Sequence, residues 1–189
     1  LLYLNSNKID ELPKTLENLI SLRDLNISGN SFSKAEKNKC KELLPDCKIS
    51  FKNSYYSIQK ALVNKKNVDV LYLSDNNLTE FPDHIEEFKN LQELHLVNNQ
   101  LKILPKSLEK LKKLKALSLS YNKITELPDF IKKLKNLQQL DLGNNQLTYL
   151  PESIEDLKKL KSILLSGNNL PQDEKEKIKK LLPNCIISF

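Results

Sequence analysis

A repeat of 23 residues constrains the fold of this 189-residue chain more than any other feature. Five asparagines recur at this interval: Asn76, Asn99, Asn122, Asn145 and Asn168. An upstream pair, Asn7 and Asn30, has the same spacing. A unit of this length cannot bury its apolar residues alone, so the units must stack and share one continuous core.

Each unit follows the pattern LxxLxLxxNxLxxLP, as in LSLSYNKITELP at 117–128. The alternation LxL predicts a short strand whose leucines point inward and whose intervening residues point outward. The asparagine amide carries two donors and an acceptor, so it can bond the turn backbone groups of adjacent coils. The proline that follows predicts a short helical or irregular turn on the return path.

This pattern resembles the leucine-rich repeat, in the 23-residue class common in bacterial proteins. The resemblance implies an α/β solenoid, a horseshoe with a parallel sheet on its concave side and helices that cap its ends. It is also compatible with export to the periplasm, the cell surface or a host. Because a curved parallel sheet displays variable side chains on a rigid scaffold, we expect a non-catalytic module that binds a host or bacterial protein, with no cofactor.

A nine-residue ending occurs twice, as LLPDCKISF at 43–51 and as LLPNCIISF at 181–189. Residues 22–51 align with 160–189 without a gap, and 15 of the 30 positions are identical. Both copies predict an amphipathic helix and a last strand, which together would cap a solenoid. The first copy therefore predicts the end of one array inside the chain.

The two endings predict two arrays. We expect residues 1–51 to be the last one and a half repeats and the cap of a first array, whose upstream repeats belong to the full-length protein. Residues 52–54 would be a linker, and 55–189 a complete second domain with five repeats and a cap at each end. Its N-terminal capping helix is predicted at 54–64, with Asn53 or Ser54 as the N-cap.

The outward strand positions are the candidate binding surface. The most distinctive side chains there are Tyr72, Asp75, Glu93, His95, Tyr121 and Asp141. Tyrosine combines apolar area with a hydroxyl at low entropic cost, which suits a protein contact. Because no lysine or arginine occupies these positions, we expect a partner with a basic or mixed surface. A metal site is not predicted, because His95 and Asp141 lie two repeats apart, about 10 Å.

The net charge of +6 comes from lysines at convex or edge positions, which we interpret as a solvated surface. Two alternatives stay open: these lysines bind anionic lipid or nucleic acid, or the protein is a spacer that self-associates through the strands CKISF and CIISF. Cys40, Cys47 and Cys185 are expected to be buried apolar side chains and not nucleophiles. No apolar run is long enough to span a bilayer.

Overall fold

A computed structural model describes residues 1–4, 7, 9–30 and 32–189 of the chain, which divides into two compact units, Leu1–Tyr55 and Tyr56–Phe189. Positions 5, 6 and 8 of the first repeat motif lie outside the described residues. The first unit contains a three-stranded sheet and two helices, which follow one another as β1 (Leu2–Tyr3), η1 (Lys14–Asn18), β2 (Asp24–Asn26), α1 (Lys34–Leu43) and β3 (Lys48–Ser50). Its three strands are parallel and lie in the order β1-β2-β3.

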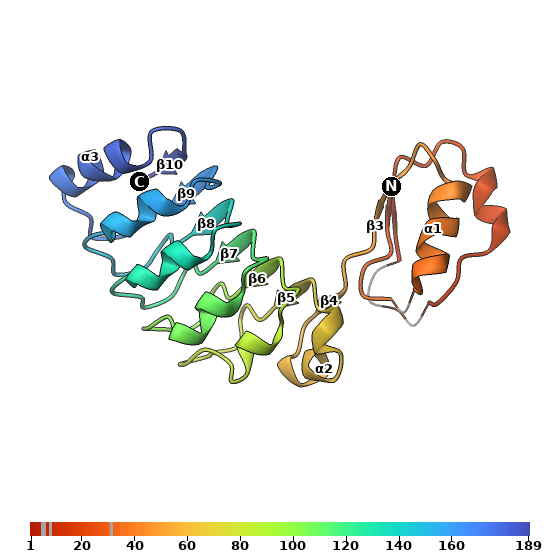
Figure 1. Cartoon of the computed structure of the whole chain (residues 1–189), viewed down its shortest axis with the longest axis horizontal. Helices are drawn as coiled ribbons and strands as arrows, with labels where there is room; N and C mark the ends of the chain where they lie inside the picture. The colour runs from red at the N-terminus through yellow and green to blue at the C-terminus, as the bar shows by residue number, and fades with distance from the viewer. Residues whose placement is uncertain (5–6, 8, 31) are drawn as a thin grey trace. The chain divides into compact units, whose positions relative to one another are not determined.

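A seven-stranded sheet has the order β10-β9-β8-β7-β6-β5-β4, and its six strands β5 to β10 form the frame of the second unit, whereas β4 consists of the last two residues of the first. The strands of this sheet are β4 (Ser54–Tyr55), β5 (Val70–Tyr72), β6 (Glu93–His95), β7 (Ala116–Ser118), β8 (Gln139–Asp141), β9 (Ser162–Leu164) and β10 (Ile186–Ser188). From β5 to β10 every pair is parallel. Figure 1 shows one such strand in each successive coil.

The return segment of each coil contains a short helix on the side opposite the strands (Figure 1). These 3-10 helices are η3 (Ile85–Glu87), η4 (Lys106–Lys110), η5 (Asp129–Lys133) and η6 (Glu152–Asp156). A proline in extended conformation precedes each of η4, η5 and η6, and its fixed φ and missing N–H suit that boundary. The turn predicted after the LP dipeptide is therefore a 3-10 helix.

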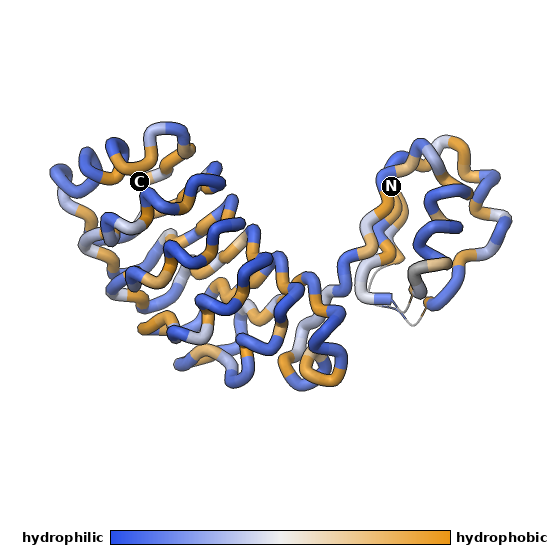
Figure 2. The backbone as a smooth tube through the Cα atoms, in the orientation of Figure 1, coloured by the Kyte–Doolittle hydropathy of each residue, from blue (hydrophilic) through white to orange (hydrophobic). Residues whose placement is uncertain are grey.

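The core lies between the strands and the return segments. Leu117 and Leu119 are buried, whereas Ser118 between them points outward and is half-buried. Figure 2 shows the resulting alternation of hydrophobic and hydrophilic stretches along every coil of the second unit. Since the same leucine positions are buried in successive coils, the chain forms the leucine-rich solenoid that the pattern predicts, with a parallel sheet and helical caps.

The repeated asparagines bond adjacent coils to one another. Asn122 donates to the carbonyl oxygens of Leu119 and Ser120 in its own turn, and to that of Leu96 in the preceding coil at 2.9 Å. Its amide oxygen accepts the N–H of Leu101 at 3.0 Å. The same pattern recurs at other ladder positions, listed here as Asn30, Asn99, Asn145 and Asn168. The amide thus replaces strand pairing where the coils leave the sheet.

The two predicted C-terminal caps are built alike. Helix α1 precedes β3 in the first unit, and α3 (Gln172–Leu181) precedes β10 in the second. Two lysines of each helix lie over the ring of the phenylalanine that follows the cap strand. The ammonium nitrogens of Lys37 and Lys41 over Phe51, and of Lys175 and Lys179 over Phe189, are 5.8–6.0 Å from the ring centroids. The aligned sequences therefore fold into the same cap.

The prediction for the N-terminal end of the second array is wrong in two respects. Residues 54 and 55 form the strand β4, and the helix, α2 (Ile58–Val63), starts later, with Ser57 as its N-cap. The sheet consequently begins before the strand near residue 70. Tyr55 has a high strand propensity, and backbone pairing at the sheet edge satisfies N–H and C=O groups that a helix start would leave unpaired.

Candidate functional site

Outward side chains of the second unit's strands form a surface that we call the open sheet face. Its central column consists of residues that pair in register from strand to strand: Tyr72, His95, Ser118, Asp141 and Leu164. A second column, two residues earlier on each strand, consists of Val70, Glu93, Ala116, Gln139 and Ser162. Val70 and Ala116 are buried and display nothing to solvent.

Three aromatic rings stack at the N-terminal end of this face. The ring centroids of Tyr56 and Tyr72 are 5.0 Å apart at an interplanar angle of 16°, and those of Tyr72 and His95 are 4.7 Å apart at 12°. We call these three residues the aromatic ladder. Tyr56 is 58% exposed, so the ladder ends in an accessible ring. Both faces of Tyr72 are covered by neighbours, which fixes its orientation.

His95 is held by polar contacts as well as by stacking. Its Nδ1 lies 3.2 Å from the Ser118 hydroxyl oxygen, and its Nε2 lies 3.5 Å from a carboxylate oxygen of Glu93. Nε2 is buried and makes no hydrogen bond to any residue that the structure describes. Each ring nitrogen of His95 therefore faces a polar group of another residue.

The environment of Tyr72 disfavours its phenolate form. Burial raises the pKa of the Tyr72 hydroxyl, and the nearby Glu93 carboxylate and the Tyr56 hydroxyl raise it further. The hydroxyl of Tyr72 thus stays protonated at neutral pH and can both donate and accept a hydrogen bond.

Two of the predicted carboxylates, those of Asp141 and Asp75, accept hydrogen bonds from neighbouring residues of the fold. One oxygen of Asp141 accepts the Ser120 hydroxyl proton at 2.8 Å, and the other accepts the backbone N–H of Gly143 at 3.0 Å. Asp75 accepts a hydrogen bond from the side-chain amide of Asn98 at 2.7 Å. These contacts order the turns that follow the strands, so both carboxylates have a structural role there.

Tyr121 lies in the turn that follows β7, at a position where the backbone is left-handed. The equivalent residues of successive coils all have positive φ: Asp75 60°, Asn98 54°, Tyr121 56°, Asn144 52° and Gly167 72°. Asparagine, aspartate and glycine adopt this conformation readily, whereas a bulky tyrosine does so at a cost. Tyr121 is nevertheless 59% exposed, so burial does not compensate for that cost.

Replacing Tyr121 with asparagine is expected to raise the free energy of unfolding by about 0.5–1 kcal/mol, because asparagine relieves the left-handed strain. Urea denaturation followed by circular dichroism measures the change. The reverse exchange at the same position of the next coil, Asn144→Tyr, should lower stability by a similar amount. A loss of stability in Tyr121→Asn would mean that the tyrosine ring makes native contacts that outweigh the strain.

The predicted candidate residues divide into two groups. Tyr72, Glu93 and His95 lie on two neighbouring strands, where Tyr72 and Glu93 both lie close to His95, whereas Asp141 lies two strands further along the central column. Asp75 and Tyr121 belong to the turns beyond the strand ends. Tyr56, which lies just before α2, joins the first group although sequence analysis did not select it. The sequence offers one weak indication of this role, an aromatic residue directly beside the first strand of the sheet.

The described residues contain no group of three or more His, Cys, Asp and Glu side chains that could hold a metal ion. Cys40 is buried as expected, but Cys47 and Cys185 are only half-buried. Burial raises the pKa of all three thiols above the ordinary cysteine value. A raised pKa lowers the thiolate fraction, which is the reverse of what an activated nucleophile needs.

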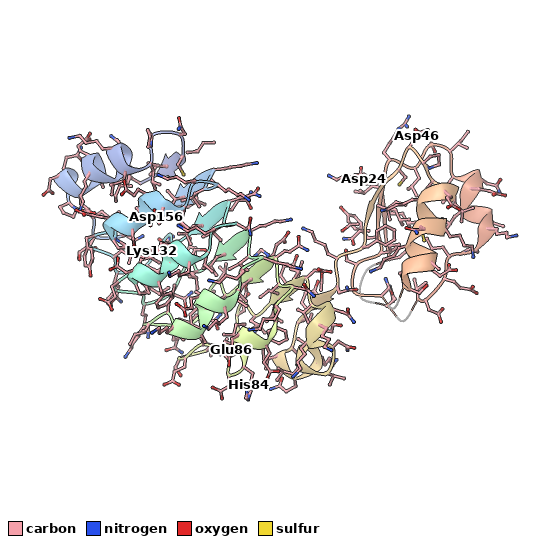
Figure 3. The ribbon with its side chains drawn as sticks, viewed as in Figure 1. Asp24, Asp46, His84, Glu86, Lys132 and Asp156 are labelled. Carbon is pink, nitrogen blue, oxygen red and sulfur yellow. The ribbon has the colours of Figure 1, made fainter. Side chains whose placement is uncertain are left out.

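Several lysines at the edge of the second unit bond side chains of the preceding coil. Lys113 donates to Asn90 at 2.6 Å, Lys115 to Gln92 at 2.8 Å, and Lys159 to Asn136 at 2.7 Å. Figure 3 labels four polar residues on the 3-10 helix side of this unit: His84, Glu86, Lys132 and Asp156. Acidic and basic side chains are mixed there, so this side does not carry a uniform positive surface.

Comparison with known proteins gives a consistent family assignment. Three family models match the chain: "Leucine rich repeat" at residues 113–170, "Leucine Rich repeats (2 copies)" at 89–133 and "Leucine Rich Repeat" at 67–88. Together they cover residues 67–170 without a gap, which is more than half of the 189 residues. No helix among the residues described here could span a membrane.

The similar proteins are longer than this chain, and the two solved structures among them share its fold. A leucine-rich-repeat protein of Leptospira interrogans is 38% identical, with a TM-score of 0.62 over 98% of this chain and 53% of that one. An internalin of Listeria monocytogenes is 21% identical, with a TM-score of 0.57 over 100% of this chain and 66% of that one. Toll-like receptor 7 of Mus musculus is 34% identical over 110 residues, 53% of this chain and 10% of the receptor. The chain thus spans about half of the Leptospira protein and a tenth of the receptor.

Proposed function

Because the chain belongs to the leucine-rich-repeat family, we propose that it is a non-catalytic module that binds a protein partner through the open sheet face of its second unit. Leucine-rich-repeat domains generally mediate interactions between proteins. The proposed contact centres on the aromatic ladder and the adjacent Glu93, with Tyr121 as a further anchor at the edge of the face.

The ordered stacking of the aromatic ladder is the observation that carries this proposal. Stacking on Tyr56 and His95 fixes the Tyr72 ring, and stacking on Tyr72 together with the hydrogen bond to Ser118 fixes the His95 ring. Side chains that are ordered before binding lose little conformational entropy when a partner arrives. Aromatic residues of this kind dominate the binding energy of many protein interfaces.

The charge of the face favours a partner with a basic or mixed surface. No lysine or arginine belongs to either column of the open sheet face, and Glu93 and Asp141 do. These two carboxylates make the face neutral to mildly acidic, which complements a basic or mixed surface on a partner.

Capture from bacterial and host extracts with the full chain tests this proposal, with the double variant Tyr72→Ala/His95→Ala as the comparison. We expect the captured protein to bind the double variant at least tenfold more weakly, which corresponds to about 1.4 kcal/mol. Tyr149→Ala is the matched control, since Tyr149 is 45% exposed and lies outside the strands. Equal affinity for the double variant and the unmodified chain, or an equal loss in Tyr149→Ala, would contradict the proposal.

Binding of anionic lipid or nucleic acid by the lysines has weaker support. Lys113, Lys115 and Lys159 are engaged in bonds between coils, and aromatic rings are not interleaved with them. Such binding would weaken steeply as salt is added, because each neutralised phosphate releases counterions. Partner binding that weakens only slightly between low and physiological salt would argue for the open sheet face, because that face carries few charges.

A further inference from the structure

The chain contains the same cap twice, which provides an internal comparison of two edge strands. β3 is an edge of the three-stranded sheet, and β10 is an edge of the seven-stranded sheet. Lys48 of β3 aligns with Ile186 of β10, and the next two residues of the strands are Ile-Ser in both. The first residue of each strand points outward, and Ile186 is 74% exposed.

The outward side chains differ between the two caps in one direction. In the first unit they are Asp24 and Asn26 of β2, and Lys48 of β3. The aligned residues of the second unit are Ser162 and Leu164 of β9, and Ile186 of β10. Leu164 is 41% exposed in addition to Ile186. The first cap folds with polar residues at these places, so folding of a cap does not require the apolar ones.

Lysine on an edge strand has a known physical effect. An edge strand presents unpaired N–H and C=O groups that can pair with another chain, and a lysine there opposes pairing because its charge would have to lose water. β3 carries this protection at Lys48, whereas the outward residues of β10, Ile186 and Ser188, are uncharged. One of the two cap edge strands, β3, thus carries a charge that opposes pairing with another chain, whereas β10 carries none among its outward residues.

At the centre of β10, one backbone N–H and one C=O bond no other strand that the structure describes. The N–H of Ile186 donates to Lys161 at 2.8 Å, and the carbonyl of Ser188 accepts from Leu165 at 2.7 Å, so these residues bond the β9 side. Because successive residues of a strand alternate in direction, the N–H and C=O of Ile187 face the opposite side. Among the described strands none lies there, since β10 is terminal in the sheet order.

We propose that β10 pairs with β10 of a second copy of this chain, antiparallel across a two-fold axis centred on Ile187. The two Ile187 residues would exchange both backbone hydrogen bonds, as in a hydrogen-bonded antiparallel pair. Ile186 of each copy would then lie opposite Ser188 of the other, on the same face of the joined sheet. The corresponding pairing of β3 would instead place Lys48 of each copy opposite Ser50 of the other, with the two like charges diagonal to each other across the contact.

The contact is small, which determines the strength of association. A stable interface buries about 800 Å² on each partner, which a three-residue strand and its neighbours do not reach. We therefore expect a dissociation constant of about 0.01 to 1 mM and a reversible equilibrium between monomer and dimer. A second copy satisfies the edge by symmetry, because the uncharged strand is its own complement.

Sedimentation velocity of the full chain over a hundredfold range of concentration tests the proposal. The unmodified chain should shift from the mass of a monomer toward that of a dimer, and Ile186→Lys should stay monomeric or associate at least tenfold more weakly. The first unit carries lysine at this same position in a folded cap, so this exchange should preserve the fold; a circular dichroism melt checks it. In Ile103→Lys, the matched control, an isoleucine that is 68% exposed changes away from the edge strand, and dimerisation should persist.

Hydrogen exchange provides a second readout that does not depend on a variant. The amide of Ile187 should exchange more slowly at high protein concentration than at low concentration, because pairing protects it. A monomer at every concentration would overturn the proposal. So would equal effects of Ile186→Lys and Ile103→Lys, which would indicate general apolar adhesion, and so would growth beyond a dimer, which a two-fold contact cannot produce.

Discussion

Replacing Asn122 with alanine is expected to lower the free energy of unfolding by about 4 kcal/mol. Asn122 is only 8% exposed, and its amide donates to carbonyls in two coils and accepts the N–H of Leu101. Alanine would leave the carbonyl of Leu96 and the N–H of Leu101 buried without partners. Each orphaned buried group costs about 1–3 kcal/mol, and the contact between adjacent coils is what holds a solenoid together.

Asn76 provides the control for this prediction, because it is the same residue type at the same repeat position. Its side chain is exposed and donates only to the carbonyl of Ser74, at 2.7 Å, among the hydrogen bonds of the described residues. Asn76→Ala should therefore cost less than about 1 kcal/mol. Urea denaturation of the two variants distinguishes them, and equal losses would show that the hydrogen bonds to the preceding coil add nothing.

Replacing Phe88 with alanine is expected to cost about 4 kcal/mol, because the side chain is fully buried and its removal opens a large cavity. Leucine occupies the equivalent positions of the next three coils: Leu111, Leu134 and Leu157. Phe88→Leu therefore tests whether the first full coil needs the larger ring. We expect it to cost less than about 2 kcal/mol, since leucine retains much of the apolar volume.

Thermal unfolding measured by calorimetry or circular dichroism would show the difference. For a chain of this size, 4 kcal/mol corresponds to a fall in Tm of about 8–16 °C. A Phe88→Ala variant with an unchanged Tm would mean that the neighbouring side chains collapse into the space, as a loosely packed end of a solenoid could allow. The same loss in Phe88→Leu would instead show that this coil is shaped around the phenyl ring.

The repeat made the parallel sheet, the buried leucines and the caps at 22–51 and 160–189 predictable, because each depends on spacing along the chain. Leu117 and Leu119 had to point to the same side once a strand was assumed. The N-terminal cap was harder, and the predicted helix at 54–64 overlaps the strand β4. Tyr55 and Ser57 satisfy local rules for either state, so sheet pairing decided between them.

The candidate site was predictable only as a set of outward positions. Sequence spacing placed Tyr72, Glu93 and His95 on one face, but it could not show that Tyr56 completes the stack or that Ser118 holds His95. Nor could it show that Asp141 bonds Ser120 and Gly143. Such contacts depend on rotamers and on turn geometry, which have no period in the sequence.

The sequence by itself determined the repeating unit, because a 23-residue period with inward leucines and a turn asparagine is satisfied by stacked parallel coils. Tertiary structure alone decided which outward residues meet, which backbone turns are left-handed, and how far the side chains of the cap strands are exposed. Tyr121, at φ 56°, and Ile186, which is 74% exposed, are examples. The residue type alone does not show that a tyrosine has a left-handed backbone or that an isoleucine is exposed, because both depend on the packing of neighbouring coils. Spacing along the chain fixes the coil, and packing between coils fixes the surface that a partner can contact.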